Sequence, residues 1–86
     1  MNLEEKEKWL MNIIVYHKKR YYSGNAKMSD RNYDAYEDDL RRINPQNPVL
    51  SLVGFSEDYF KYITRNEWYS DKIPYMLKED IKLFRG

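Results

Sequence analysis

The first 43 residues of the chain carry two apolar repeats of helical period, joined by a short polar loop. An apolar stripe with i, i+3, i+4, i+7 spacing predicts the first helix over residues 2–23. Its N-cap would be Asn2, with Glu5 three residues later in a variant of the capping box, and Gly24 suits its C-terminal end. The stripe consists of Leu3, Leu10, Ile13, Ile14, His17 and Tyr21.

A second helix is predicted from residue 30 to residue 43. Ser29 is a suitable N-cap and Asp30 lies in the first turn. Pro45 ends the helix, because the residue before a proline is driven out of the α region. The apolar face is formed by Tyr33, Tyr36, Leu40 and Ile43. Since the connecting loop is short, we expect the two helices to pack as an antiparallel hairpin over residues 2–43.

Residues 44–86 are expected to complete a single domain. Residues 44–55 contain two of the three prolines and predict an extended segment across the hairpin, with four apolar residues for the core: Val49, Leu50, Leu52 and Val53. A short helix is predicted over residues 56–64, through Tyr59, Phe60 and Ile63. Residues 66–74 are ambiguous, and residues 76–84 predict one or two helical turns. The fold class is therefore a small all-α domain of 86 residues, burying only about 60% of its unfolded surface.

The residue types present exclude several kinds of site. There are no cysteines, which excludes disulfides and thiolate zinc sites, and the single histidine, His17, excludes a multi-histidine metal site within one chain. The net charge of +1 excludes a strong overall field, so nucleic-acid or membrane affinity would need a local patch. The longest apolar run, Ile13-Ile14-Val15, is too short for a bilayer span or a signal peptide. We expect a soluble, cytoplasmic protein without a metal site.

Tyrosines and aspartates gather around the predicted interhelical loop. Tyr21 and Tyr22 end the first helix, while Asp30 and Asp34 share one face of the second, with Tyr33 beside them. Two carboxylates at this spacing repel each other, and a bound partner is one candidate for the compensation. Aromatic faces attract cations and carboxylates accept hydrogen bonds from ribose hydroxyls, which suits the nicotinamide end of oxidised NAD. From the residue types alone, however, core packing of the tyrosines, with Asp30 stabilising the helix dipole, is the stronger interpretation.

The motif Tyr21-Tyr22, followed by Ser29-Asp30-x-x-Tyr33-Asp34, resembles the N-terminal nucleotide-binding region of the NAD-dependent DNA ligases. In that family a helix ending in Tyr-Tyr or Tyr-His precedes Ile-Ser-Asp-x-x-Tyr-Asp and an amphipathic helix. The resemblance implies a helical domain, called Ia, which grips the nicotinamide mononucleotide half of NAD and closes on an adenylation domain. It implies cofactor-binding roles for Tyr21, Tyr22, Asp30, Tyr33 and Asp34. Pro48, Val53-Gly54 and residues 72–77 resemble later elements of the family more weakly.

The chain also departs from the ligase pattern. The interhelical loop is one residue shorter and lacks the usual proline, and the Asp-Ser-Pro-Thr element before Val-Gly is absent. No Lys-x-Asp-Gly occurs, so the covalent lysine nucleophile is missing and we expect no catalytic residue and no ligation by this protein alone. Our leading hypothesis is a stand-alone Ia-like module that recognises the nicotinamide nucleotide part of NAD and, lacking the adenosine half of the site, binds NAD weakly by itself. It would be a subunit of a split ligase, with an adenylation domain as partner, or a phage-encoded modulator of ligase or NAD chemistry.

A rival interpretation is a protein-interaction module or inhibitor that keeps the hairpin as a scaffold. Its docking face would be the C-terminal aromatic residues Phe60, Tyr62, Trp68, Tyr69 and Tyr75. Direct nucleic-acid binding ranks last, because we interpret the basic residues 18–20 and 41–42 as surface charges. His17 is predicted to be a packed core histidine rather than a catalytic base, and residues 37–39 a solvated acidic face rather than a metal site.

Overall fold

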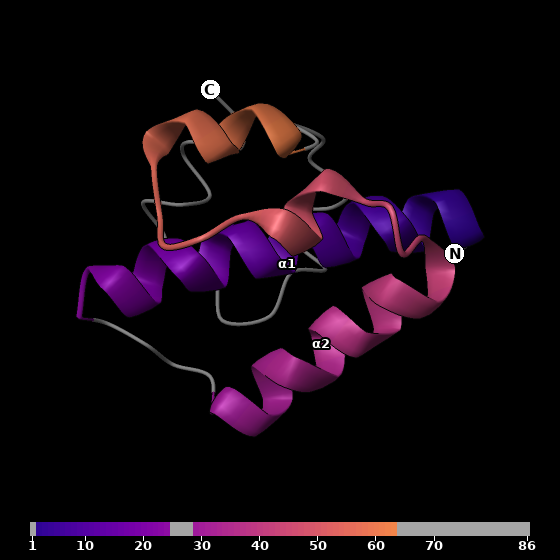
Figure 1. Ribbon diagram of the computed structural model, residues 1–86, viewed down its shortest axis with the longest axis horizontal. Coiled ribbons are helices and arrows are strands. Elements are labelled where there is room, and N and C mark those ends of the chain that lie inside the picture. Colours follow the sequence, from indigo (N-terminus) through magenta and orange to yellow (C-terminus); the bar gives the residue numbers. More distant parts are fainter. Residues whose placement is uncertain (1, 25–28, 64–86) are drawn as a thin grey trace.

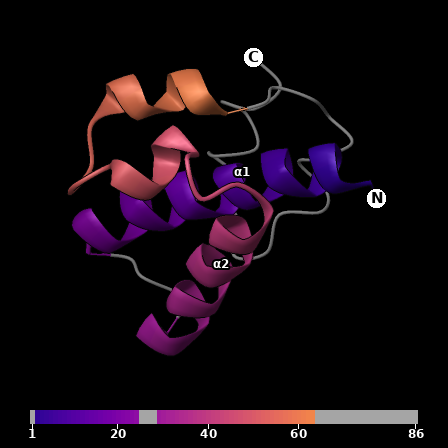
Figure 2. The same ribbon diagram turned by 45° about the vertical axis from the view of Figure 1, so that its right-hand side comes forward.

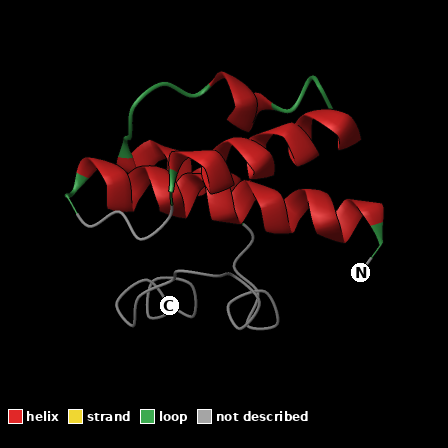
Figure 3. Ribbon diagram, turned by 90° about the horizontal axis from the view of Figure 1, so that it is seen from below, coloured by secondary structure: helices red, strands yellow, loops and turns green. Residues whose placement is uncertain are grey.

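The computed structural model of the chain describes residues 2–24 and 29–63. Two α-helices, α1 (Leu3–Tyr22) and α2 (Asp30–Ile43), are followed by two short 3-10 helices, η1 (Pro48–Ser51) and η2 (Glu57–Tyr62). Helices α1 and α2 run in opposite directions, which confirms the predicted hairpin (Figure 1). Over the described ranges the chain forms helices and loops without a β-strand, as Figure 3 shows, so the all-α prediction is confirmed.

Helix α1 is the central element of this arrangement. It contacts α2, η1 and η2, and Figures 1 and 2 show α2 below α1 and η2 above it, while η1 contacts both α1 and α2. The core clusters include Val15 and Tyr16 of α1, which lie outside the predicted stripe. The single stripe predicted for α1 was therefore too narrow. Neither α1 nor α2 is long and apolar enough to cross a membrane.

The helix ends confirm the predicted caps. The Asn2 side chain accepts a hydrogen bond from the backbone N–H of Glu5 at 2.8 Å, and Ser29 accepts one from Asn32 at 3.2 Å. At the end of α1, Gly24 adopts a φ of +81°, a left-handed conformation that costs glycine little and most other residues more. These local signals set the bounds of both helices within one residue of the sequence prediction.

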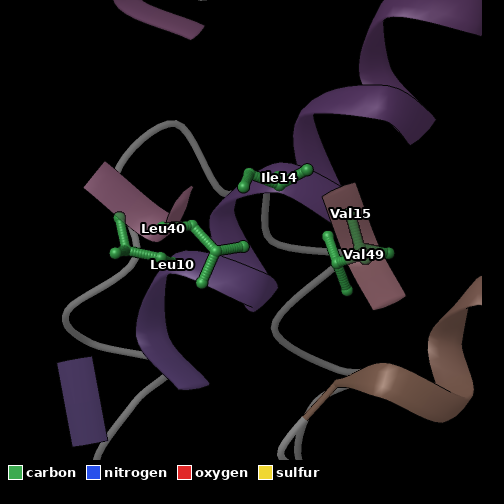
Figure 4. Close-up of a cluster of buried hydrophobic side chains, with 5 residues drawn as sticks. All are labelled: Leu10, Ile14, Val15, Leu40 and Val49. Carbon is green, nitrogen blue, oxygen red and sulfur yellow. The ribbon is translucent and has the colours of Figure 1, made fainter. Parts of the chain in front are cut away.

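The main core joins α1, α2 and η1. Its fully buried side chains come from all three elements: Leu10, Ile14, Val15, Leu40 and Val49. Figure 4 shows Leu40 of α2 beside Leu10 of α1, and Val49 of η1 beside Val15. This packing holds the middle of α1 against the end of α2 and against η1.

Residues 44–55, which return over the hairpin after α2, differ from the extended segment that was predicted for them. Residues 48–51 form η1 because Pro48 presets the first turn and the Asn47 side chain accepts a hydrogen bond from the N–H of Val49 at 2.9 Å. The Asn47 and Asn44 amides both donate to one Glu7 carboxylate oxygen on α1, at 2.7 and 2.9 Å, which anchors this turn to the hairpin. Val49 is buried as predicted, but Val53 is 84% exposed, so the prediction that Val53 joins the core was wrong.

The following turn, predicted as a helix over residues 56–64, is the 3-10 helix η2, with Ser56 as its N-cap. Phe60 and Tyr62 are part of the predicted docking face, yet both pack against the core; the Phe60 ring lies 5.9 Å from the ring of Tyr16. Trp68, Tyr69 and Tyr75, together with the helical turns predicted beyond residue 64, lie outside the described residues. The docking face and the bounds of the domain therefore stay predictions.

Candidate nucleotide-binding cavity

A cavity of about 120 Å³ lies where the end of α1 meets the start of α2, and it is open to solvent. Its lining consists of His17, Lys18, Tyr21, Tyr22, Asp30 and Tyr33. Pockets that enclose a whole small molecule typically measure roughly 300–1,000 Å³. This cavity therefore has room for one end of a nucleotide, such as a flat ring, rather than for a complete dinucleotide.

Helical spacing brings the α1 residues of the lining together. His17 and Tyr21 are four residues apart and therefore lie one above the other, and the same holds for Lys18 and Tyr22. The His17 ring lies 6.0 Å from the ring of Tyr21, and the Tyr21 and Tyr22 rings lie 5.1 Å apart, edge to face. Tyr21 and Tyr22 remain 51% and 61% exposed, so their rings are accessible to a ligand.

The first turn of α2 supplies the opposite side of the cavity. Asp30 and Tyr33 are three residues apart and project from the same face, and the Ser29 cap sets where that face begins. The Tyr33 ring lies 4.3 Å from the ring of His17, at an angle of 31°, so an aromatic contact joins the two helices here. Asp30 is exposed and sits in the first turn, where the helix dipole favours its negative charge.

Four of the five residues predicted to bind the cofactor thus line one cavity. The fifth, Asp34, is exposed and lies one turn further along α2, outside the lining. Two cavity residues had been given other roles. His17 is buried, as predicted for a core histidine, but it also faces the cavity. Lys18 had been interpreted as a surface charge, and that interpretation was wrong.

Burial governs the protonation of the two aromatic groups at the centre of the site. It lowers the pKa of His17 below the ordinary value of 6.5, against the opposing influence of Asp30, so the imidazole is neutral at pH 7. Burial also raises the pKa of the Tyr33 hydroxyl far above its usual range, and the neighbouring Glu37 adds to this shift. Both rings are therefore uncharged at neutral pH, and neither repels a cationic ligand.

The Tyr33 hydroxyl is also buried, and it makes no hydrogen bond within the described part of the chain. Most buried polar groups in native proteins have a partner, because an unsatisfied one costs free energy. The Tyr33 hydroxyl, unpaired in the described part of the structure, is therefore a free-energy cost of the free protein, on a residue that lines the cavity.

Two ion pairs lie further along α2. In the acidic stretch of α2, Asp38 pairs with Arg41 at 2.6 Å and Asp39 with Arg42 at 3.0 Å, which agrees with a solvated acidic face. Among residues 2–24 and 29–63, no three acidic or histidine side chains converge as metal ligands would. On α1, Arg20 is buried and Lys18 lines the cavity, so the basic residues 18–20 do not share one exposed patch.

Comparison with known proteins finds similarity to DNA ligases. The chain is 38% identical over 45 residues to the DNA ligase of Treponema pallidum (strain Nichols), and 50% identical over 34 residues to that of Sorangium cellulosum (strain So ce56). These matches cover 52% and 40% of this chain but only 6% and 5% of the two ligases. No protein-family model and no solved structure matches the chain. The chain therefore contains a region similar to DNA ligases and spans a small part of their length.

Proposed function

We propose that the cavity recognises the nicotinamide mononucleotide half of NAD, and that the chain is an Ia-like module of the kind found in NAD-dependent DNA ligases. The observation that carries this proposal is the convergence of Tyr21, Tyr22, Asp30 and Tyr33 on one cavity. Those residues were assigned to the cofactor from their resemblance to the ligase motif. The similarity of part of the chain to two DNA ligases supports the same proposal.

Each cavity residue has a chemical role in this proposal. The exposed rings of Tyr21 and Tyr22 stack on the cationic nicotinamide ring. The His17 ring is neutral and therefore does not repel the positive charge of the nicotinamide. The Asp30 carboxylate accepts hydrogen bonds from the ribose hydroxyls and offsets the positive charge of the ring. Tyr33 forms one wall of the cavity. Asp34, one turn further along α2, adds a second carboxylate on the side of the same ribose.

The small volume of the cavity explains why a partner is part of the proposal. A site that holds only one end of NAD gives weak affinity, and an adenylation domain would supply the adenosine half. The chain contains no Lys-x-Asp-Gly, so the lysine nucleophile of ligation would also come from that partner. The chain would then serve as a subunit of a split ligase or, as a phage-encoded protein, as a modulator of ligase or NAD chemistry.

Calorimetric titration with nicotinamide mononucleotide tests the proposed site. Asp30→Asn should weaken binding at least tenfold, because a charge-assisted hydrogen bond contributes roughly 1.5–3 kcal/mol. The matched control is Asp38→Asn, which removes the same charge from the same helix outside the cavity and should leave binding unchanged. Equal loss in both variants would show that the nucleotide responds to overall charge and not to this site.

A reconstitution experiment tests the proposed partner. The chain is added to the adenylation domain of an NAD-dependent ligase that lacks its own Ia region, and transfer of AMP to the domain's lysine is measured. A split-ligase role predicts that the chain restores adenylation and that Tyr21→Ala does not. If the chain instead lowers adenylation by an intact ligase, it acts as a modulator; no effect in either assay would contradict both roles.

A further inference from the structure

One cation lines the cavity in a position that recognition of a nicotinamide ring does not explain. The Lys18 side chain is part of the lining, and its ammonium lies 5.8 Å from the centre of the Tyr33 ring. The same ammonium donates a hydrogen bond to the backbone carbonyl of Leu52 at 3.1 Å. Lys18 therefore lies between the cavity and the segment that follows η1.

The Leu52 carbonyl uses only part of the hydrogen-bonding capacity of Lys18. An ammonium group has three N–H donors, and within the described residues Lys18 gives one of them to Leu52. Burial lowers the pKa of Lys18 from 10.5, and the nearby Glu37 acts in the opposite direction. Because the ordinary value is so high, Lys18 remains charged at pH 7 with donors left for an acceptor in the cavity.

The charges around the cavity have opposite signs. Asp30 contributes a negative charge from α2 and Lys18 a positive charge from α1, while His17, which also lines the cavity, is neutral. A purely cationic ligand, such as a nicotinamide nucleoside, would be attracted by Asp30 and repelled by Lys18. A ligand with a cationic ring at one end and an anionic group at the other would match both charges.

We propose that Lys18 recognises the phosphate of the bound nucleotide and makes the cavity selective for a nicotinamide nucleotide over the nucleoside. This inference rests on the proposed function, because it assumes that the ring and ribose occupy the Tyr21–Asp30 side of the cavity. The hydrogen bond to Leu52 fixes the ammonium before the ligand arrives, and such preorganisation reduces the entropy cost of binding.

The test is a pair of calorimetric titrations, with nicotinamide mononucleotide and with nicotinamide riboside, which lacks the phosphate. The unchanged protein should bind the mononucleotide about tenfold more tightly, as expected for a charge-assisted hydrogen bond to phosphate. In Lys18→Met this preference should fall to near one. Lys18→Arg keeps the charge and should retain most of the preference. The control Lys8→Met removes a cation from the same helix, outside the cavity, and should leave the preference unchanged.

The outcomes separate this inference from the proposed function. Equal affinity of the unchanged protein for both ligands would overturn the role of Lys18 while leaving nicotinamide recognition intact. A Lys18→Met variant that binds both ligands more weakly by the same factor would show that Lys18 only tethers the Leu52 segment, which also overturns the inference. If the unchanged protein binds neither ligand, the proposed function itself fails, and the phosphate role fails with it.

Discussion

The Tyr33→Phe substitution removes one oxygen atom from a buried position and should make the free protein more stable. The hydroxyl is buried and has no hydrogen-bond partner within the described residues. A buried polar group without a partner costs roughly 1–3 kcal/mol, and the phenylalanine ring keeps the contact with His17. After allowing for the packing contacts of the lost oxygen, we expect a gain of about 1 kcal/mol. For a chain of this size, that gain corresponds to a rise of roughly 4–8 °C in Tm.

Thermal and urea unfolding, followed by the helical circular dichroism signal, measure this effect. Tyr22→Phe is the matched control, because its hydroxyl belongs to a side chain that is 61% exposed; its stability should change by less than about 0.5 kcal/mol. A loss of stability of about 1 kcal/mol or more in Tyr33→Phe would refute the reasoning, since it would mean that the hydroxyl makes a favourable hydrogen bond in the free protein.

Two further predictions concern protonation and the anchor of η1. Burial lowers the pKa of His17, so an NMR titration of its ring should give a midpoint below 6.5, and Asp30→Asn should lower that midpoint further by removing a charge that favours the imidazolium. Because the unfolded chain binds this proton more readily, the His17 contribution to stability is complete above pH 6.5 and decreases as pH falls through the folded pKa. A midpoint at or above 6.5 would contradict the buried position of His17. Asn47→Ala removes both the η1 cap and the hydrogen bond to Glu7, and should lower the free energy of unfolding in urea by about 1–2 kcal/mol. An unchanged unfolding midpoint would show that neither contact stabilises the fold.

Local sequence signals were sufficient for the helical hairpin. Asn2 and Ser29 accept the hydrogen bonds expected of N-caps, and Leu40 occupies the core position that its spacing predicts. These features depend on residues a few positions apart in the chain. The two carboxylates Asp30 and Asp34 were predicted together because they share one helix face, but only Asp30 lies close enough to α1 to line the cavity. Which turn of α2 meets α1 depends on packing between the helices, and spacing within one helix does not determine it.

Features that depend on distant parts of the chain could not be predicted in this way. Lys18 was interpreted as a surface charge, because the residues next to it in the sequence do not indicate its partner. That partner is the Leu52 carbonyl, 34 residues further along the chain, which accepts its hydrogen bond. Val53 has the apolar character of a core residue, yet it lies in the segment between η1 and η2 and is 84% exposed. The surroundings of both side chains depend on how residues 44–55 lie against the two helices. The spacing of residues within one helix does not determine this.

The central claim is that the cavity between α1 and α2 binds a nicotinamide nucleotide, and the His17 ring tests it most directly. His17 is the one histidine of the chain and lines the cavity, so its NMR ring signals report on this site without ambiguity. The account predicts that they shift progressively and reach saturation as nicotinamide mononucleotide is added to millimolar concentration, the range of a weak site of about −4 kcal/mol. If the His17 signals stay unchanged over that range, the cavity does not bind the nucleotide and the claim is wrong.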